Sequence, residues 1–280
     1  MIELGKNNVL EVAREVDFGL YLTDGTDDVL LPIKYVPEGT KVGDQLDVFI
    51  YKDSEDRIIA TTLEPFARLD EVAALEVVDT HAAGAFMDWG LEKDLFVPLK
   101  EQHAKMKEGG VYVVRVCYDH RTDRLIGVSK INSFFQTDIA GLSEGHEVSL
   151  LVYGQTDLGF NVVVDNSYTG LIYHDDVFVP LNIGDQTGGF IKTLRPDGKI
   201  DVTVRPVGLD AIESAKKTIM VNLRFSKEGG IDLHDKSDAE EIKLKLGMSK
   251  KLFKKAVGGL YKEGKIEMTE AGIKVKSQTT

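Results

Sequence analysis

The sequence predicts a mainly β protein in which three tandem five-stranded barrels precede an α+β winged helix-turn-helix domain. Three segments share one sequence plan with a period of about 70 residues, and such a repeat indicates one structural unit per copy. Near Val207 the apolar periodicity changes from that of strands to that of helices. The expected domains are therefore barrels at 1–64, 65–136 and 137–206 and a C-terminal domain at 207–280.

Each repeat has the composition of a small closed barrel. Five short runs rich in Val, Ile, Phe and Tyr are separated by turn clusters such as 23–25 and 196–198. A glycine lies within two residues of an aromatic residue early in each repeat, at Gly19, Gly84 and Gly159. Such a glycine is typical of a strand that bends around a barrel corner. Five strands that close on themselves form a barrel of the OB type.

The C-terminal domain is predicted from helical spacing, capping residues and a final hairpin. Apolar residues recur at helical spacing between Val207 and Leu223. Gly247 and Ser249 mark the end of one later helix and the start of the next. The remaining elements are expected, in order, to be a strand at 231–233, a helix opened by the capping-box spacing of 237–240, a helix at 250–262, and a hairpin of 266–268 with 273–275.

Two strand motifs resemble the S1 RNA-binding domain. Residues 159–162 (Gly-Phe-Asn-Val) precede 170–173 (Gly-Leu-Ile-Tyr), much as Gly-x-Phe-Val precedes Gly-Leu-Val-His in that family. The second repeat matches at 84–87, and the first repeat is the most degenerate. Over nearly all 280 residues the chain is similar to the conserved virulence factor B family of bacterial RNA-binding proteins, with the most specific match at 246–262. This resemblance implies S1/OB-type barrels, RNA binding and an influence on RNA stability or gene expression.

An S1-type barrel binds single strands on the face of its second and third strands, where rings stack on bases and cations hold phosphates. By this analogy the candidate RNA-binding residues are Phe18 and Tyr21 in the first barrel, Phe86, Trp89, Phe96 and Arg115 in the second, and Phe160, Tyr168, Tyr173, Lys192, Arg195 and Arg205 in the third. The alternative for each ring is that it fills a barrel core. Trp89 is expected to be exposed because it lies in a turn-like Asp-Trp-Gly segment, and Tyr173 has the best motif position.

A cluster of lysines marks the helix that would be the recognition element of the winged helix. Lys250, Lys251, Lys254 and Lys255 form two pairs four residues apart, so they share one sector of the helix. Contact with a polyanion, including duplex nucleic acid, is the functional interpretation. The alternative is a solvated helix face, since lysine commonly serves solubility.

The charge is unevenly distributed along the chain. The formal net charge is −12, yet the segment from Val207 onward has 15 Lys+Arg against 11 Asp+Glu, a balance of +4 that leaves −16 for the first 206 residues. Such asymmetry indicates modules with different partners. The acidic barrels cannot attract a polyanion by their overall field, so they would need stacking surfaces and a few placed cations.

Several classes of protein are not favoured. No apolar run has the roughly 18 residues of a membrane span, and the N-terminus shows no signal peptide, so a cytoplasmic protein is expected. The single Cys117 precludes an internal disulfide and is expected to be a buried structural thiol. The six histidines are scattered, and no phosphate-binding loop or nucleophile elbow is present, so we expect no enzyme activity, metal or cofactor.

Three functions stay open at this point. The first is a non-enzymatic protein that binds single-stranded RNA with low specificity and acts as a post-transcriptional regulator. The second is a DNA-binding transcription regulator that uses its winged helix, and the third is a protein-interaction scaffold whose barrels are inactive. Preference for RNA over duplex DNA separates the first two.

Overall fold

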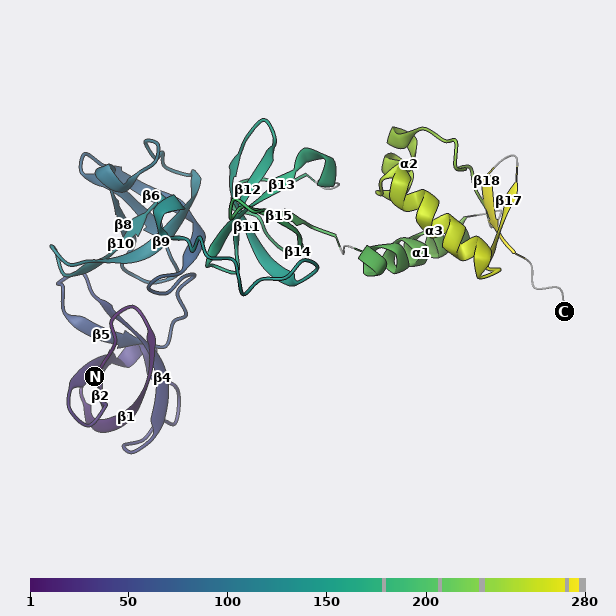
Figure 1. Cartoon of the computed structure of the whole chain (residues 1–280). Helices are drawn as coiled ribbons and strands as arrows, with labels where there is room; N and C mark the ends of the chain where they lie inside the picture. The colour runs from purple at the N-terminus through teal and green to yellow at the C-terminus, as the bar shows by residue number, and fades with distance from the viewer. Residues whose placement is uncertain (178–179, 206–207, 227–229, 270–271, 277–280) are drawn as a thin grey trace.

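The fold consists of three consecutive β units followed by a C-terminal α+β domain; in the view of Figure 1 the first unit lies below the second and the third lies to its right. The computed structural model describes residues 1–177, 180–205, 208–226, 230–269 and 272–276. The predicted fold class, S1/OB-type barrels before a winged helix, is confirmed. The expected boundary at 206/207 lies outside the described residues.

The first and third units are closed barrels. The first barrel consists of β1 (Asn7–Val16), β2 (Gly19–Thr23), β3 (Asp28–Pro32), β4 (Gln45–Lys52) and β5 (Ile58–Thr61). The third barrel consists of β11 (Glu147–Gln155), β12 (Gly159–Val164), β13 (Tyr168–Tyr173), β14 (Gln186–Leu194) and β15 (Ile200–Thr203). The strand order is β1-β2-β3-β5-β4 in the first and β11-β12-β13-β15-β14 in the third. In both barrels the ring is completed by a parallel pairing of the third strand with the fifth. This is the five-stranded topology of an OB-type barrel.

The second unit departs from the expected closed ring. Its strands are β6 (Val72–His81), β7 (Gly84–Asp88), β8 (Leu95–Pro98), β9 (Val111–Asp119) and β10 (Arg124–Val128), in the order β10-β9-β6-β7-β8. Both edge strands are fully described, and no hydrogen-bonded ladder joins them. Instead, side chains fill the seam, since a Cβ on Gly127 of β10 would lie 2.7 Å from Cγ2 of Val97 on β8. The second barrel is therefore open along one seam.

The glycine at the start of each second strand has a clear steric role. A Cβ on Gly19 would lie 2.1 Å from the carbonyl oxygen of Leu31 on the third strand. The corresponding distances are 2.3 Å from Gly84 to Val97 and 1.9 Å from Gly159 to Ile172. No real Cβ tolerates such distances, because they lie far inside van der Waals contact. The repeated glycine thus lets the third strand pack against the second at the barrel corner.

The C-terminal domain has the predicted order of elements. It contains α1 (Gly208–Phe225), β16 (Gly230–Ile231), α2 (Ala239–Leu246), α3 (Lys250–Lys262), β17 (Ile266–Thr269) and β18 (Gly272–Val275). Ser249 caps α3 by accepting a hydrogen bond from the Leu252 amide, as predicted. At α2 the expected cap is displaced by one residue: Asp238 accepts from the Glu240 amide, while the Ser237 hydroxyl is buried and accepts from the His234 amide.

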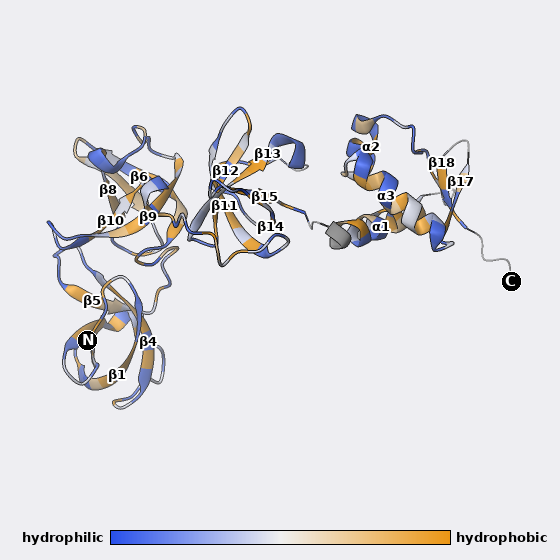
Figure 2. Cartoon of the chain, in the orientation of Figure 1, coloured by the Kyte–Doolittle hydropathy of each residue, from blue (hydrophilic) through white to orange (hydrophobic). Residues whose placement is uncertain are grey.

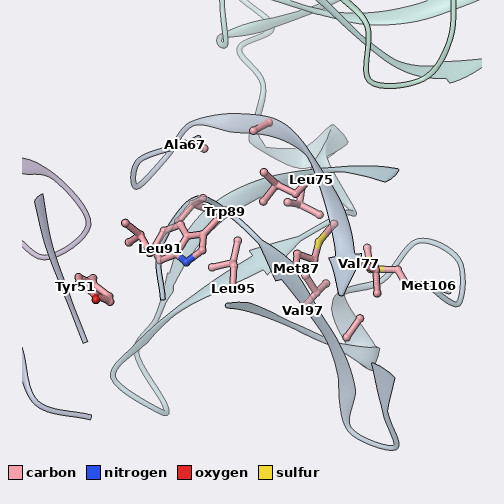
Figure 3. Packing of buried hydrophobic residues seen from close by; sticks show 14 of the residues in the cluster. Tyr51, Ala67, Leu75, Val77, Met87, Trp89, Leu91, Leu95, Val97 and Met106 are labelled. Carbon is pink, nitrogen blue, oxygen red and sulfur yellow. The ribbon is translucent and has the colours of Figure 1, made fainter. Parts of the chain in front are cut away.

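Apolar packing joins neighbouring barrels. Hydrophobic residues lie along the strands of the barrels and along α1 and α3, alternating with hydrophilic ones (Figure 2). Phe49 and Tyr51 of the first barrel belong to the same buried cluster as Trp89 and Leu91 of the second (Figure 3). A second cluster, which includes Val113, Ile131, Leu151 and Val163, joins the second barrel to the third.

Among the described helices none is long and apolar enough to cross a bilayer.

Cys117 lies on β9 and is half-buried. Burial raises the pKa of its thiol to about 11. The thiolate is the reactive form, so we expect Cys117 to react with a disulfide reagent at pH 8 at least about 100-fold more slowly than a free cysteine. The measurement is the reaction rate in native buffer and again in guanidinium, where the rate should return to that of a free thiol. Equal rates in both conditions would contradict the burial of this group.

Candidate nucleic-acid interface

A hollow of about 690 Å³ opens on the second barrel at the face formed by its second and third strands, β7 and β8. The β6–β7 and β9–β10 loops of the same barrel border it, and the first barrel contributes residues from the end of β4. Residues that line it include Tyr51, Lys52, Ser54, His81, Phe86, Lys93, Asp94, Phe96, Lys100, Arg124 and Ile126. The hollow occupies the position at which OB-type barrels bind oligonucleotides.

Two phenylalanines form an aromatic platform in this hollow. Phe86 of β7 and Phe96 of β8 lie directly opposite each other in the strand register, and their ring centroids are 5.1 Å apart. Both rings are half-buried, so part of each ring is open to the hollow. Gly84 leaves space for the Phe96 ring, which a Cβ there would contact at 2.8 Å. The structure thus brings together two of the predicted stacking residues.

The charges around the hollow are balanced. The Arg124 guanidinium donates to Asp56 at 2.9 Å, and the Lys93 ammonium lies 3.3 Å from the same carboxylate. Lys52 pairs with Asp123. Desolvation, together with neighbouring carboxylates, raises the pKa of Asp94. Each of these three cations therefore already has a carboxylate partner, and a phosphate that enters the hollow has to compete with that carboxylate.

The equivalent face of the first barrel carries a second hollow, of about 530 Å³. Phe18 lines it with 55% of its surface exposed, and its ring meets Tyr21 edge to face at 6.5 Å between centroids. The Arg14 guanidinium lies 4.1 Å from the Tyr21 ring centroid and bonds Asp28. Sequence reasoning missed Arg14, because its position opposite Tyr21 depends on the register of β1 with β2, which has a bulge there.

The third barrel offers fewer open rings than predicted. The prediction that Phe160 stacks on bases is wrong: the ring is 7% exposed and belongs to the barrel core. Tyr168 is half-buried and also packs against that core. The Tyr173 hydroxyl bonds Arg195, whose guanidinium pairs with Asp201 at 3.0 Å. An aromatic residue at the position of Phe160 can face either the core or the surface, because the periodicity of the sequence does not determine which face of the strand is buried.

Lys192 of the third barrel is the remaining predicted cation on this barrel's strands. It lies on β14, with its ammonium 2.6 Å from Asp176. Its side chain is 42% exposed, so this pair is solvated and contributes little to stability. A phosphate could compete with Asp176 for this lysine at small energetic cost.

Two predicted residues of the second barrel lie at its junctions with the neighbouring barrels, and of these Trp89 also lines the hollow. The expectation of an exposed Trp89 is wrong: it is 3% exposed, its indole Nε1 donates to the Lys93 carbonyl at 2.6 Å, and its ring meets Phe49 edge to face. The first barrel covers the turn, which no local pattern could show. Arg115 lies away from the predicted face. It is on the fourth strand at the junction with the third barrel, bonds Asp70 at 3.0 Å and faces the Phe134 ring.

The remaining predicted cations lie at or within the C-terminal domain. Arg205 is half-buried beside Ala211 and Met248, where desolvation lowers its pKa, so it belongs to the junction with the winged helix. On α3, three of the predicted lysines are exposed, namely Lys251, Lys254 and Lys255. Lys250 is half-buried and donates to the Lys236 carbonyl. The described residues contain no group of three His, Cys, Asp or Glu that could hold a metal ion.

Comparison with known proteins agrees with this domain order. The S1 domain family model matches residues 4–63, and the model of the CvfB-like winged helix domain matches residues 217–275. Conserved virulence factor B of Staphylococcus aureus is 24% identical over 83% of this chain and 82% of its own. The resemblance to the conserved virulence factor B family is confirmed. The YitL protein of Bacillus subtilis is 29% identical, over 94% of this chain and 90% of its own.

One solved structure covers nearly the whole chain. It is the crystal structure of a multidomain protein with nucleic acid binding domains from Streptococcus pneumoniae. That protein is 25% identical, and the match covers 97% of this chain and 98% of the other with a TM-score of 0.45. Both domain types found by the family models, S1 barrels and winged helices, are folds that commonly bind nucleic acid.

Proposed function

We propose that this chain is a non-enzymatic, cytoplasmic protein that binds single-stranded RNA with little sequence preference and regulates gene expression after transcription. The observation that carries the proposal is the aromatic platform of Phe86 and Phe96 in the hollow of the second barrel. Base stacking on such rings tolerates every base, because each base has a π-face. The match of residues 4–63 to the S1 domain family supports nucleic-acid binding.

The three barrels would act together on one RNA. Each isolated face is small and nearly balanced in charge, so the affinity of each is expected to be low. Once one barrel has bound the RNA, the binding of the same RNA by the other barrels of the chain is intramolecular. This raises the overall affinity without new contacts. The apolar clusters that join the barrels fix their spacing, so little ordering entropy is lost on binding.

The test is fluorescence anisotropy of the full-length protein with a labelled single-stranded RNA and a labelled duplex DNA. Phe96→Ala should weaken RNA binding by about 5-fold to 150-fold, since stacking on one ring contributes about 1–3 kcal/mol per base. Phe66→Ala is the matched control, because Phe66 is 63% exposed and outside the hollow. Circular dichroism checks that both variants fold. Equal RNA affinity of Phe96→Ala and wild type would overturn the proposed site.

A second candidate function rests on the exposed lysines of α3. If the winged helix binds duplex DNA, affinity should fall steeply with salt, because each neutralised phosphate releases a counterion. The double variant Lys254→Glu, Lys255→Glu should then weaken duplex binding strongly and reduce the slope of log affinity against log salt. Tighter binding of duplex DNA than of RNA, lost in this variant, would transfer the function to the winged helix. Absence of all nucleic-acid binding would favour a protein-interaction scaffold.

A further inference from the structure

The hollows of the first and second barrels share a wall. Tyr51, Ser54, Glu92 and Lys93 line both of them. Tyr51 and Ser54 come from the first barrel, and Glu92 and Lys93 come from the second. The two ligand faces therefore meet at the junction between the barrels, and each barrel supplies part of the other's hollow.

The junction is held in place by polar contacts as well as by the buried cluster around Trp89. The Lys93 ammonium donates to the Asp53 carbonyl at 2.6 Å, and the Lys52 ammonium donates to the Asp123 carbonyl at 2.7 Å. Arg124 of the second barrel forms a salt bridge with Asp56 of the first. These contacts cross the junction in both directions, with a cation from each barrel reaching the loop between the fourth and fifth strands of the other. Such reciprocal contacts fix the register of the two faces.

Aromatic rings line each of the two joined hollows. Phe18 lines the hollow of the first barrel, and Phe86 and Phe96 line that of the second. The cations Lys34, Lys93 and Arg124 each pair with a carboxylate across the junction between the two barrels. Two of these pairs are solvated, with side chains about half exposed, so a phosphate can displace the carboxylate at small cost. Rings that flank exchangeable cations are the arrangement that a single strand needs for its bases and backbone.

We propose that the first two barrels form one composite groove, in which a single RNA strand runs from the platform of Phe86 and Phe96 across the shared wall to Phe18. The inference rests on the proposed function and specifies its binding unit. The occupant is single-stranded nucleic acid long enough to fill both hollows. A shorter strand occupies the larger hollow, that of the second barrel, and leaves the first barrel empty.

The experiment is a length series of unstructured single-stranded RNAs of about 4 to about 16 nucleotides, the range of site sizes of OB-type barrels. Each RNA is titrated with the full-length protein by anisotropy, and the stoichiometry is measured by calorimetry. We expect affinity to rise at least about tenfold when one strand fills both hollows, with one long RNA bound per chain. Phe18→Ala should remove most of this gain and leave short-strand affinity within about twofold of wild type, whereas Phe96→Ala should weaken strands of every length.

Phe18→Ala is expected to fold, because more than half of that side chain is exposed, and Phe66→Ala is again the matched control. If Phe18→Ala leaves long-strand affinity unchanged while Phe96→Ala lowers it, or if two long strands bind per chain, the barrels bind separately. The composite groove is then overturned although RNA binding stands. If no RNA of any length binds, the proposed function itself fails.

Discussion

Gly159→Ala is expected to destabilise the third barrel by about 3 kcal/mol or more, the cost of a severe overpacking that a backbone must relieve. The new Cβ would lie 1.9 Å from the Ile172 carbonyl oxygen and 2.9 Å from the Tyr173 Cα. Both contacts are to backbone, so no side-chain rotation can relieve them. The β12–β13 pairing must open instead, and this pairing holds the second and third strands of the barrel together.

The measurement is denaturant unfolding followed by two probes. The chain has one tryptophan, Trp89, which reports on the junction of the first two barrels, while far-ultraviolet circular dichroism reports on the whole chain. In Gly159→Ala part of the dichroism signal should be lost at lower denaturant, before the tryptophan transition. Gly188→Ala is the matched control in the same barrel, because a Cβ at Gly188 would meet nothing within 4 Å. Identical unfolding of both variants would contradict the close approach of β13.

Trp89→Ala is expected to cost about 3–5 kcal/mol, the usual range for truncating a large buried aromatic residue. The indole fills the junction between the first two barrels, where it touches Phe49 at 5.8 Å between ring centroids. Its loss would also leave the Lys93 carbonyl without the indole donor. Since Lys93 belongs to the shared wall of the two hollows, the affinity for long RNA should fall together with stability.

Thermal unfolding by circular dichroism measures this effect, because the variant has no tryptophan fluorescence. Trp89→Phe serves as the graded control: it keeps an apolar ring but loses the indole N–H, so it should lie between the alanine variant and wild type. A melting temperature of Trp89→Ala equal to that of wild type would show that the junction contributes nothing to stability.

The winged helix was the part of the fold most directly readable from the sequence. Its helices begin and end at residues with strong local preferences, such as Ser249 at the start of α3 and Gly247, which adopts the left-handed conformation with φ of 61°. These signals act over three or four residues, so they survive without tertiary context. The one shifted cap, Asp238 in place of Ser237, lies where two adjacent residues can both cap a helix.

The candidate site was only partly predictable. Phe86 and Phe96 follow from the repeat, because the motif positions place them on the second and third strands. The roles of Trp89 and Arg115 could not be predicted, because both are determined by neighbouring barrels. The same limit applies to Phe160, whose inward direction depends on how its strand is turned against the core.

The sequence by itself determined the number, order and type of the domains, because strand and helix periodicity, turn residues and caps are local properties of the chain. It also placed Phe86 and Phe96 on the second and third strands of the second barrel. Only the tertiary structure decided that the second barrel is open at its β8–β10 seam, that Trp89 is buried at a junction, and that two hollows share one wall. These features arise where surfaces distant in sequence meet, and burial there depends on the relative position of whole barrels, which no local pattern specifies.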